Sequence, residues 1–265
     1  MHSLASPIAS PGLVAIADRA PVACKICRGP SPLFGVVDFH KSCMEGKGMR
    51  ASLSGCPVYY RRCERCGFVF TDTFDGWAPE EFKRRIYNEE YILVDPDFAE
   101  LRPAANARMV GESFRAWRDS IRILDYGGGT GVLAERLRGE GFAAETYDPF
   151  SSFDAIPSGS FDLITCFEVM EHVPRPRETV KTMAGLLTED GAILFSTLVQ
   201  PEGFEKEGLG WWYAAPRNGH ISLYSTIALG TLFGQVGMRV VSFSAAMHMA
   251  YGRRPVFADG LRLPA

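Results

Sequence analysis

The sequence predicts a layered α/β fold with a small cysteine-rich module in front of it. Two observations carry this prediction: a glycine-rich turn between an apolar strand and an amphipathic helix near residues 123–138, and two C-x-x-C pairs before residue 70. With 265 residues, 46% of them hydrophobic, the chain can bury one full α/β core and carry an appendage. We expect a flexible leader over residues 1–20, a metal-binding module over 21–75, a helical lid or linker over 76–118 and an α/β domain over 119–265.

Composition favours some classes of partner over others. The formal net charge of −3 gives no global attraction to nucleic acid or to an anionic membrane. No apolar run reaches the roughly 18–20 residues that a membrane-spanning helix needs, so we expect no membrane contact. The first twenty residues lack the basic start and apolar core of a secretion signal. Seven cysteines without such a signal indicate reduced thiols and a cytoplasmic protein.

The cysteine pairs predict a zinc site. They are separated by residues 28–62 and consist of Cys24, Cys27, Cys63 and Cys66. Four thiolates on two tight turns can close a tetrahedral site with no open coordination position, so we expect a structural zinc. Gly67 follows the second pair, where such a turn needs an unusual backbone angle. Cys43 and Cys56 could each replace a ligand, but simple thiols are the preferred interpretation for both.

Helical spacing of aromatic and charged residues predicts the lid. A first helix begins at Pro79, which suits a first turn, and residues 102–117 form a further helix. The loop between them contains Tyr91. Tyr87 and Tyr91 either line a pocket or pack against the edge of the sheet.

The glycine turn is the most informative stretch of the chain. An apolar strand containing Asp125 runs into Gly127, Gly129 and Gly131, and an amphipathic helix follows at once. Glycines let the backbone approach a ligand and take positive φ, and the helix behind them offers unpaired N–H groups. Dinucleotide folds use G-x-G-x-x-G and bind a pyrophosphate at this point. Here an acid stands two residues before the first glycine, which favours a ligand with a cationic amino group instead.

The D-x-G-x-G-x-G pattern resembles the first motif of class I S-adenosylmethionine (SAM) methyltransferases. A second strand ends at Asp148, F-D-x-I follows at 161–164, E-x-x-E-H stands at 168–172, and a fifth strand covers 191–197. The resemblance extends over about residues 120–245. It implies a Rossmann-like α/β sandwich with a mostly parallel sheet, and SAM as the methyl donor.

The same resemblance implies roles for several residues. Asp125 and the glycine backbone would hold the methionine part of SAM, and Asp148 the two ribose hydroxyls. A carboxylate can accept from two adjacent hydroxyls, so the physics of that position agrees. Phe150 and Asp154 are weaker candidates for the adenine side, while Phe167 and Glu168 frame the pocket.

Two histidines are candidate general bases for the acceptor: His172 and His220. Glu168, Glu171 and His172 stand at i, i+3 and i+4, so on one helical turn they could instead hold a divalent metal. His220 lies in a loop rich in proline and glycine, with aromatic residues that suit a ring substrate and an arginine that suits a phosphate or carboxylate. The substrate candidates are Tyr91, Trp211, Trp212, Tyr213 and Arg217. The alternative is a structural loop that covers the sheet edge. His248 is expected to be a packing or surface histidine.

The predicted function is methyl transfer from SAM to a small polar acceptor. Some bacterial sugar methyltransferases carry a similar four-cysteine module, which favours a sugar or another secondary-metabolite or envelope precursor. Some ribosomal RNA methyltransferases also begin with such a module, so RNA is the alternative acceptor. The acidic balance argues against it, because phosphate contacts need clustered Lys and Arg. A non-catalytic scaffold is the third alternative. The oligomeric state is not predicted.

Overall fold

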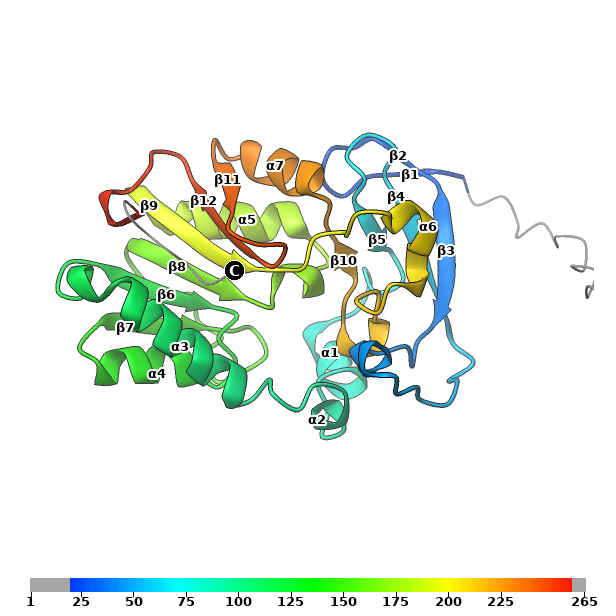
Figure 1. Ribbon diagram of the computed structural model, residues 1–265, viewed down its shortest axis with the longest axis horizontal. Helices are drawn as coiled ribbons and strands as arrows, with labels where there is room; N and C mark the ends of the chain where they lie inside the picture. The colour runs from blue at the N-terminus through cyan, green and yellow to red at the C-terminus, as the bar shows by residue number, and fades with distance from the viewer. Residues whose placement is uncertain (1–19, 259–265) are drawn as a thin grey trace, which may run out of the picture.

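The computed structural model describes residues 20–258. The leader predicted for residues 1–20 therefore lies outside the described residues, apart from its last position. Figure 1 shows two sheets side by side, a larger one with helices on both faces and a smaller one built by the N-terminal part of the chain. The helical segment α1–α2 lies below the junction between them.

The larger sheet has six strands in the order β11-β12-β9-β8-β6-β7. Its strands are β6 (Arg122–Tyr126), β7 (Ala143–Tyr147), β8 (Phe161–Phe167), β9 (Leu187–Ser196), β11 (Arg239–Ser242) and β12 (Met247–Tyr251). The pairs β7–β6, β6–β8 and β8–β9 are parallel, whereas β12 is antiparallel to both of its neighbours. Only β12 therefore runs against the others, which confirms the prediction of a mostly parallel sheet.

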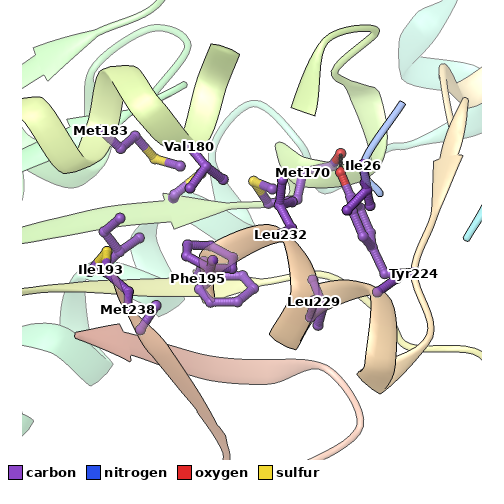
Figure 2. Close-up of a cluster of buried hydrophobic side chains, with 14 of the residues drawn as sticks. Ile26, Met170, Val180, Met183, Ile193, Phe195, Tyr224, Leu229, Leu232 and Met238 are labelled. Carbon is purple, nitrogen blue, oxygen red and sulfur yellow. Dashed lines mark hydrogen bonds between the residues drawn. The ribbon is translucent and has the colours of Figure 1, made fainter. Parts of the chain in front are cut away.

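Helices cover both faces of this sheet because its strands are apolar on both sides. The helices are α3 (Leu101–Ser113) and α4 (Val132–Gly139) on one face, and α5 (Pro176–Gly185) and α7 (Thr226–Gly234) on the other. Neighbouring residues of β9 alternate between the two cores: Ile193 and Phe195 pack with α5 and α7, and Leu194 packs with α3 and α4. Figure 2 shows the first of these cores. The Rossmann-like sandwich is confirmed.

The smaller sheet contains a strand from the far end of the chain. Its order is β10-β5-β4-β3, and its strands are β3 (Leu33–Asp38), β4 (Pro57–Arg62), β5 (Val69–Thr71) and β10 (Ser222–Leu223). A separate short ladder pairs β1 (Val22–Ala23) with β2 (Pro30–Ser31). The segment between the cysteine pairs thus forms the hairpin of β3 and β4, and β5 and β10 complete the sheet.

The remaining elements are short. The predicted lid contains α1 (Pro79–Arg85) and α2 (Tyr91–Val94), and α6 (Phe204–Glu207) lies in the segment after β9. The 3₁₀ turns are η1 (Cys43–Lys47), η2 (Arg115–Trp117), η3 (Met170–His172), η4 (Gly208–Gly210), η5 (Pro216–Asn218) and η6 (Val256–Ala258). No helix within residues 20–258 is long and apolar enough to cross a membrane.

Packing does not follow the predicted division at residues 75 and 118. One buried cluster joins Tyr60 of the small sheet, Ile86 of the lid and Trp211 of the segment after β9. Another joins Phe68, just after the second cysteine pair, to Tyr224 and the helices of the large sheet. The three predicted regions therefore share continuous cores.

Phe68 tests this continuity. Its ring is fully buried and lies 5.0 Å from the ring of Tyr224, between centroids. We expect Phe68→Ala to lower the free energy of unfolding by about 3–5 kcal/mol because it leaves a cavity, and the whole chain to unfold in one transition. Urea denaturation followed by tryptophan fluorescence and far-UV circular dichroism measures both. Val241→Ala, at an exposed position of β11, is the control and should change stability by under about 0.5 kcal/mol.

Candidate functional site

The glycine turn connects β6 to α4 at the carboxyl edge of the large sheet. Gly127, Gly129 and Gly131 all have positive φ, at 77°, 56° and 84°. A Cβ at Gly127 would overlap the side chain of Val169, and one at Gly128 would overlap the carboxylate of Asp125. The sequence pattern singled out 127, 129 and 131 but missed Gly128, whose need for glycine comes from this close approach rather than from its φ.

Asp148 ties the loop after β7 to the glycine turn. Its Oδ2 accepts the Gly129 N–H at 2.9 Å, and its Oδ1 accepts the Phe150 N–H at 2.7 Å. Each carboxylate oxygen keeps capacity for a second hydrogen bond. The carboxylate is nine-tenths buried and fixed beside the glycines, which is the position that a ribose-binding acid needs.

Asp125 lies beneath the turn. Its carboxylate is buried, and its Oδ1 accepts a hydrogen bond from the Thr165 hydroxyl at 2.9 Å. The pKa of Asp125 is raised to about 7, mainly by burial and to a smaller extent by the charge of Asp148, against the hydrogen bond from Thr165. Such a group strongly favours a nearby cation in its ionised form.

Glu168 follows β8 with a φ of 55°, a strained conformation for a residue other than glycine. Ser196, at the end of β9, stabilises it from the neighbouring strand. The Ser196 Oγ accepts the Glu168 N–H at 2.8 Å and donates to Glu168 Oε1 at 2.7 Å. The pKa of Glu168 is raised to about 7, first by burial and then by the nearby charge of Glu171. Ser196 was not predicted, and no pattern in the sequence marks it.

Glu171, His172 and His220 form a second cluster of polar groups. One carboxylate oxygen of Glu171 and one ring nitrogen from each histidine all lie within 4.8 Å of one another. The sequence predicted that Glu168, Glu171 and His172 could hold a metal, but Glu168 is not in this group. The 3₁₀ turn η3 places Glu171 and His172 beside His220 instead. Glu171 Oε2 and His172 Nδ1 are buried without a hydrogen-bond partner. Leaving such atoms unpaired costs about 1–3 kcal/mol each, which is typical of a site that a ligand completes.

Burial also sets the charge of the two histidines. It lowers the pKa of His172 to about 4 and the pKa of His220 well below its usual value of 6.5. Both rings are therefore neutral near pH 7, and each keeps one lone pair. The rings meet edge to face, with centroids 4.9 Å apart. Burial raises the pKa of Glu171.

Segments far apart in the sequence hold the loop that carries His220. From the small sheet, Tyr60 donates its hydroxyl hydrogen to the His220 carbonyl at 2.6 Å. From the lid, Tyr91 donates to the Asn218 carbonyl at 3.3 Å. From the large sheet, Glu171 accepts the Ile221 N–H through its main-chain carbonyl at 2.9 Å. The position of His220 therefore depends on all three parts of the molecule.

Tyr87 connects this cluster to the loop after β7. Its ring centroid lies 5.4 Å from that of Phe150 and 6.1 Å from that of His172. Phe150 is half-buried and packs toward the lid, because its ring centroid also lies 6.1 Å from that of Phe82. The residues predicted for the donor and those predicted for the acceptor thus lie on one side of the sheet, at its carboxyl edge. Phe167 ends β8 and packs against the core shared with α3 and α4.

The predicted substrate residues are mostly occupied within the chain. Trp211 is 3% exposed and packs between Phe204 and Tyr213. Arg217 is buried and donates to the Ile86 carbonyl at 3.0 Å and to Asn88 at 3.2 Å. These contacts agree with the structural alternative for both residues, in which the loop covers the edge of the sheet.

The other candidates differ in exposure. Tyr91 is buried and bonded to Asn218, whereas Trp212 is 38% exposed and packs beside Gly46. Asp154 is exposed, and His248 is fully buried. His248 has partners at both nitrogens, Ser242 and the Thr197 carbonyl. It is a packing histidine, one of the two outcomes expected for it.

The four predicted zinc ligands come together. The Sγ atoms of Cys24, Cys27, Cys63 and Cys66 all lie within 4.8 Å of one another. The sulfur–sulfur distances are 3.8 Å for Cys24–Cys66, 3.3 Å for Cys27–Cys63 and 3.6 Å for Cys27–Cys66. A tetrahedral site with Zn–S bonds of about 2.3 Å has sulfur atoms about 3.8 Å apart. The donor set and its spacing fit zinc. Cys43 lies at His220 and Cys56 is exposed, so neither belongs to this cluster.

Comparison with known proteins identifies the family. Residues 98–243, more than half of the chain, match the sequence model of the methyltransferase domain family. The chain belongs to that family. Among curated proteins, a ubiquinone biosynthesis O-methyltransferase of Salmonella paratyphi A is 30% identical over 118 residues, which cover 35% of this chain and 46% of the relative. The corresponding protein of Neisseria meningitidis serogroup C is 33% identical over 104 residues, covering 29% and 44%. The chain spans about half the length of these relatives.

Solved structures of methyltransferases share part of the fold at low identity. Human N-acetylserotonin methyltransferase in complex with SAM is 15% identical, with a TM-score of 0.46 over 70% of this chain and 62% of that one. An O-methyltransferase family protein from Burkholderia thailandensis is 14% identical, with a TM-score of 0.42 over 59% of each chain.

The raised pKa of Asp125 predicts how stability depends on pH. In the unfolded chain this carboxyl has a pKa near 3.8, and in the folded protein about 7. Between these values the folded state holds a proton that the unfolded state has lost, so the group reduces stability as pH rises and the loss is complete above pH 7. Asp125→Asn keeps an oxygen for Thr165 and cannot ionise. Between pH 5 and pH 8 we expect wild type to lose about 2–3 kcal/mol more of its free energy of unfolding than this variant, because two of those pH units lie below the folded pKa; urea denaturation of the ligand-free proteins at both pH values measures the difference.

Glu168 titrates in both proteins and cancels from that comparison. An identical pH dependence of wild type and Asp125→Asn would show that Asp125 is ionised at neutral pH in the ligand-free protein.

Proposed function

We propose that the protein is a SAM-dependent methyltransferase that acts on oxygen in a small, uncharged polar acceptor. The observation that carries the donor assignment is the joining of Asp148 to the glycine turn, with both carboxylate oxygens fixed by main-chain N–H groups. In this arrangement Asp148 accepts from the ribose hydroxyls, the glycine backbone lies against the methionine part, and Asp125 balances its cationic amino group. Membership of the methyltransferase domain family supports the donor.

His220 is the general base in this proposal. Methyl transfer is a direct displacement, in which the acceptor oxygen bonds to the methyl carbon as the carbon–sulfur bond breaks. The proton of a neutral hydroxyl must leave, and the neutral His220 ring can take it. His172 is the second candidate, with its buried and unpaired Nδ1. A carboxylate oxygen of Glu171 lies within 4.8 Å of a ring nitrogen of each histidine, so its ionised form would stabilise the imidazolium that forms.

The charges around the cluster support an uncharged acceptor. Arg217 is bonded to the lid, and Lys41 donates to the Trp211 carbonyl at 2.9 Å and pairs with Glu45. The carboxyls of Glu168 and Glu171 lie near the cluster, and each disfavours an anion when it is ionised. The nearby Arg102 is paired with Asp95. A hydroxylated ring or sugar hydroxyl fits better than a phosphate, which also argues against RNA. The curated relatives are named as O-methyltransferases, which supports oxygen as the accepting atom.

The zinc site has a supporting role in this proposal. When bound, zinc would cross-link the two cysteine pairs and leave no open position for chemistry. The turn it closes is bonded to the large sheet, because the Ser225 hydroxyl donates to the Cys66 carbonyl at 2.6 Å and caps α7. Zinc thus fixes the small sheet, whose Tyr60 holds the His220 carbonyl.

Calorimetry with SAM tests the donor site. We expect wild-type protein to bind SAM and to contain one zinc per chain, and Asp148→Ala to bind SAM about 10- to 100-fold more weakly with unchanged zinc content. Glu145→Ala, whose carboxylate on β7 pairs with Arg122 at the surface, should bind normally. Failure of the zinc-loaded wild type to bind SAM would leave only the scaffold alternative, and a zinc-free protein would contradict the metal assignment.

Labelled-methyl transfer tests the base. A panel of acceptors with catechols, hydroxylated aromatic rings and sugar hydroxyls is incubated with SAM labelled in its methyl group. For the acceptor that is methylated, we expect His220→Ala to lower turnover by about 10²- to 10⁴-fold and to leave the Kd for SAM within twofold. Unchanged turnover would remove His220 from the mechanism. A second metal ion per chain that His220→Ala loses would make His220 a ligand instead of a base.

A further inference from the structure

Tyr213 contacts two members of the cluster formed by Glu171, His172 and His220, called the acceptor cluster below. It follows Trp212 in the loop after β9, and its side chain is 4% exposed. Its ring packs against the ring of His220 with centroids 4.2 Å apart. It is bonded to His220 through its main chain and to Glu171 through its side chain.

The main-chain carbonyl of Tyr213 determines which nitrogen of His220 carries the proton. His220 Nδ1 lies 2.9 Å from this carbonyl oxygen. A carbonyl can only accept, so Nδ1 must carry the hydrogen in the neutral ring. The lone pair of the neutral ring then resides on Nε2. The thiol of Cys43 is 3.7 Å from Nδ1, and burial raises its pKa to about 12, so it adds no negative charge.

The hydroxyl of Tyr213 fixes the carboxylate of Glu171. It donates to Glu171 Oε1 at 2.6 Å and accepts the Leu198 N–H at 3.2 Å. With Oε1 held, the other oxygen, Oε2, is the buried atom without a partner. The hydroxyl hydrogen is already used, so Tyr213 has no donor left for a substrate. This differs from the substrate contact that the sequence predicted for it.

We propose that Tyr213 is a positioning residue that holds the base and its counter-charge in one arrangement. Its carbonyl selects the His220 tautomer with the lone pair on Nε2, and its hydroxyl holds Glu171 Oε1 while Oε2 remains without a hydrogen-bond partner. This inference rests on the proposed role of His220 as base. Phenylalanine would keep the packing and the carbonyl contact but would leave Glu171 Oε1 without its donor.

Replacing Tyr213 by Phe separates the two contacts. We expect Tyr213→Phe to lower kcat for the methylated acceptor about tenfold or more, because a hydrogen bond to a charged group is lost. KM and the Kd for SAM should stay within twofold, since Tyr213 touches neither ligand. In a Glu171→Ala background the same change should alter kcat by less than twofold, because the hydroxyl has nothing left to position.

Tyr224→Phe is the matched control. Tyr224 is also fully buried, and its hydroxyl donates to the Met170 carbonyl at 2.9 Å, on the turn that carries Glu171. It contacts neither the Glu171 carboxylate nor the His220 ring. We expect a similar loss of stability in both variants but a fall in kcat only in Tyr213→Phe. Equal falls in kcat would reduce Tyr213 to a structural residue and overturn the proposal.

The histidine tautomer is measured without any acceptor. In ¹⁵N-histidine-labelled wild-type protein, the His220 signals should be those of a neutral ring with hydrogen on Nδ1. Tyr213→Phe should keep this tautomer, because the carbonyl remains. A wild-type ring with hydrogen on Nε2 would overturn the proposal even if His220→Ala is inactive. If His220→Ala is fully active while the tautomer is as expected, the base assignment fails and the tautomer selection by Tyr213 stands.

Discussion

The site depends on the hydrogen bonds that fix residues 211–223 between the two sheets. β10 pairs with β5, with Ser222 opposite Phe70, and the next residue toward the N-terminus, Ile221, donates its N–H to the Glu171 carbonyl. Together these bonds place the His220 backbone at a fixed distance from the end of β8. If this segment moved, His220 would leave Glu171 and His172 while the glycine turn stayed in place. The glycine turn and the cluster that contains His220 are therefore held in place by separate sets of interactions.

The two sets also differ in what they cost the fold. At the glycine turn, both carboxylate oxygens of Asp148 accept main-chain N–H groups, and the Thr146 hydroxyl beside it is buried without a partner. In the cluster of the two histidines, two atoms of ionisable groups are buried and unpaired, Glu171 Oε2 and His172 Nδ1. The larger cost to stability therefore falls on the cluster to which we assign the acceptor. Such groups are available to an incoming hydroxyl without first breaking internal bonds.

The sequence predicted the parts of the site that depend on local backbone geometry. The positive φ of Gly127, Gly129 and Gly131 is a short-range property that a motif can express. The two cysteine pairs lie far apart in sequence, but the ligand number of zinc predicts that they meet. The sequence could not predict the other contacts across the chain. Trp211 and Arg217 are spaced like ligand-binding residues in a loop, yet they pack on Phe204 and bond to Ile86. Buried clusters cross the predicted boundaries at residues 75 and 118, and a two-residue strand such as β10 has no recognisable sequence pattern.

The pairing of β10 with β5 has a consequence for synthesis of the chain. About 150 residues separate the two strands in sequence, and at 5–20 residues per second the ribosome needs roughly 8–30 s to make them. During that interval the N-terminal ribbon is complete in sequence but has one strand edge without its final neighbour. An open edge is a place where another chain can pair. Both cysteine pairs are synthesised before this interval begins. Metal bound by the nascent chain would therefore hold the two pairs together until β10 is made.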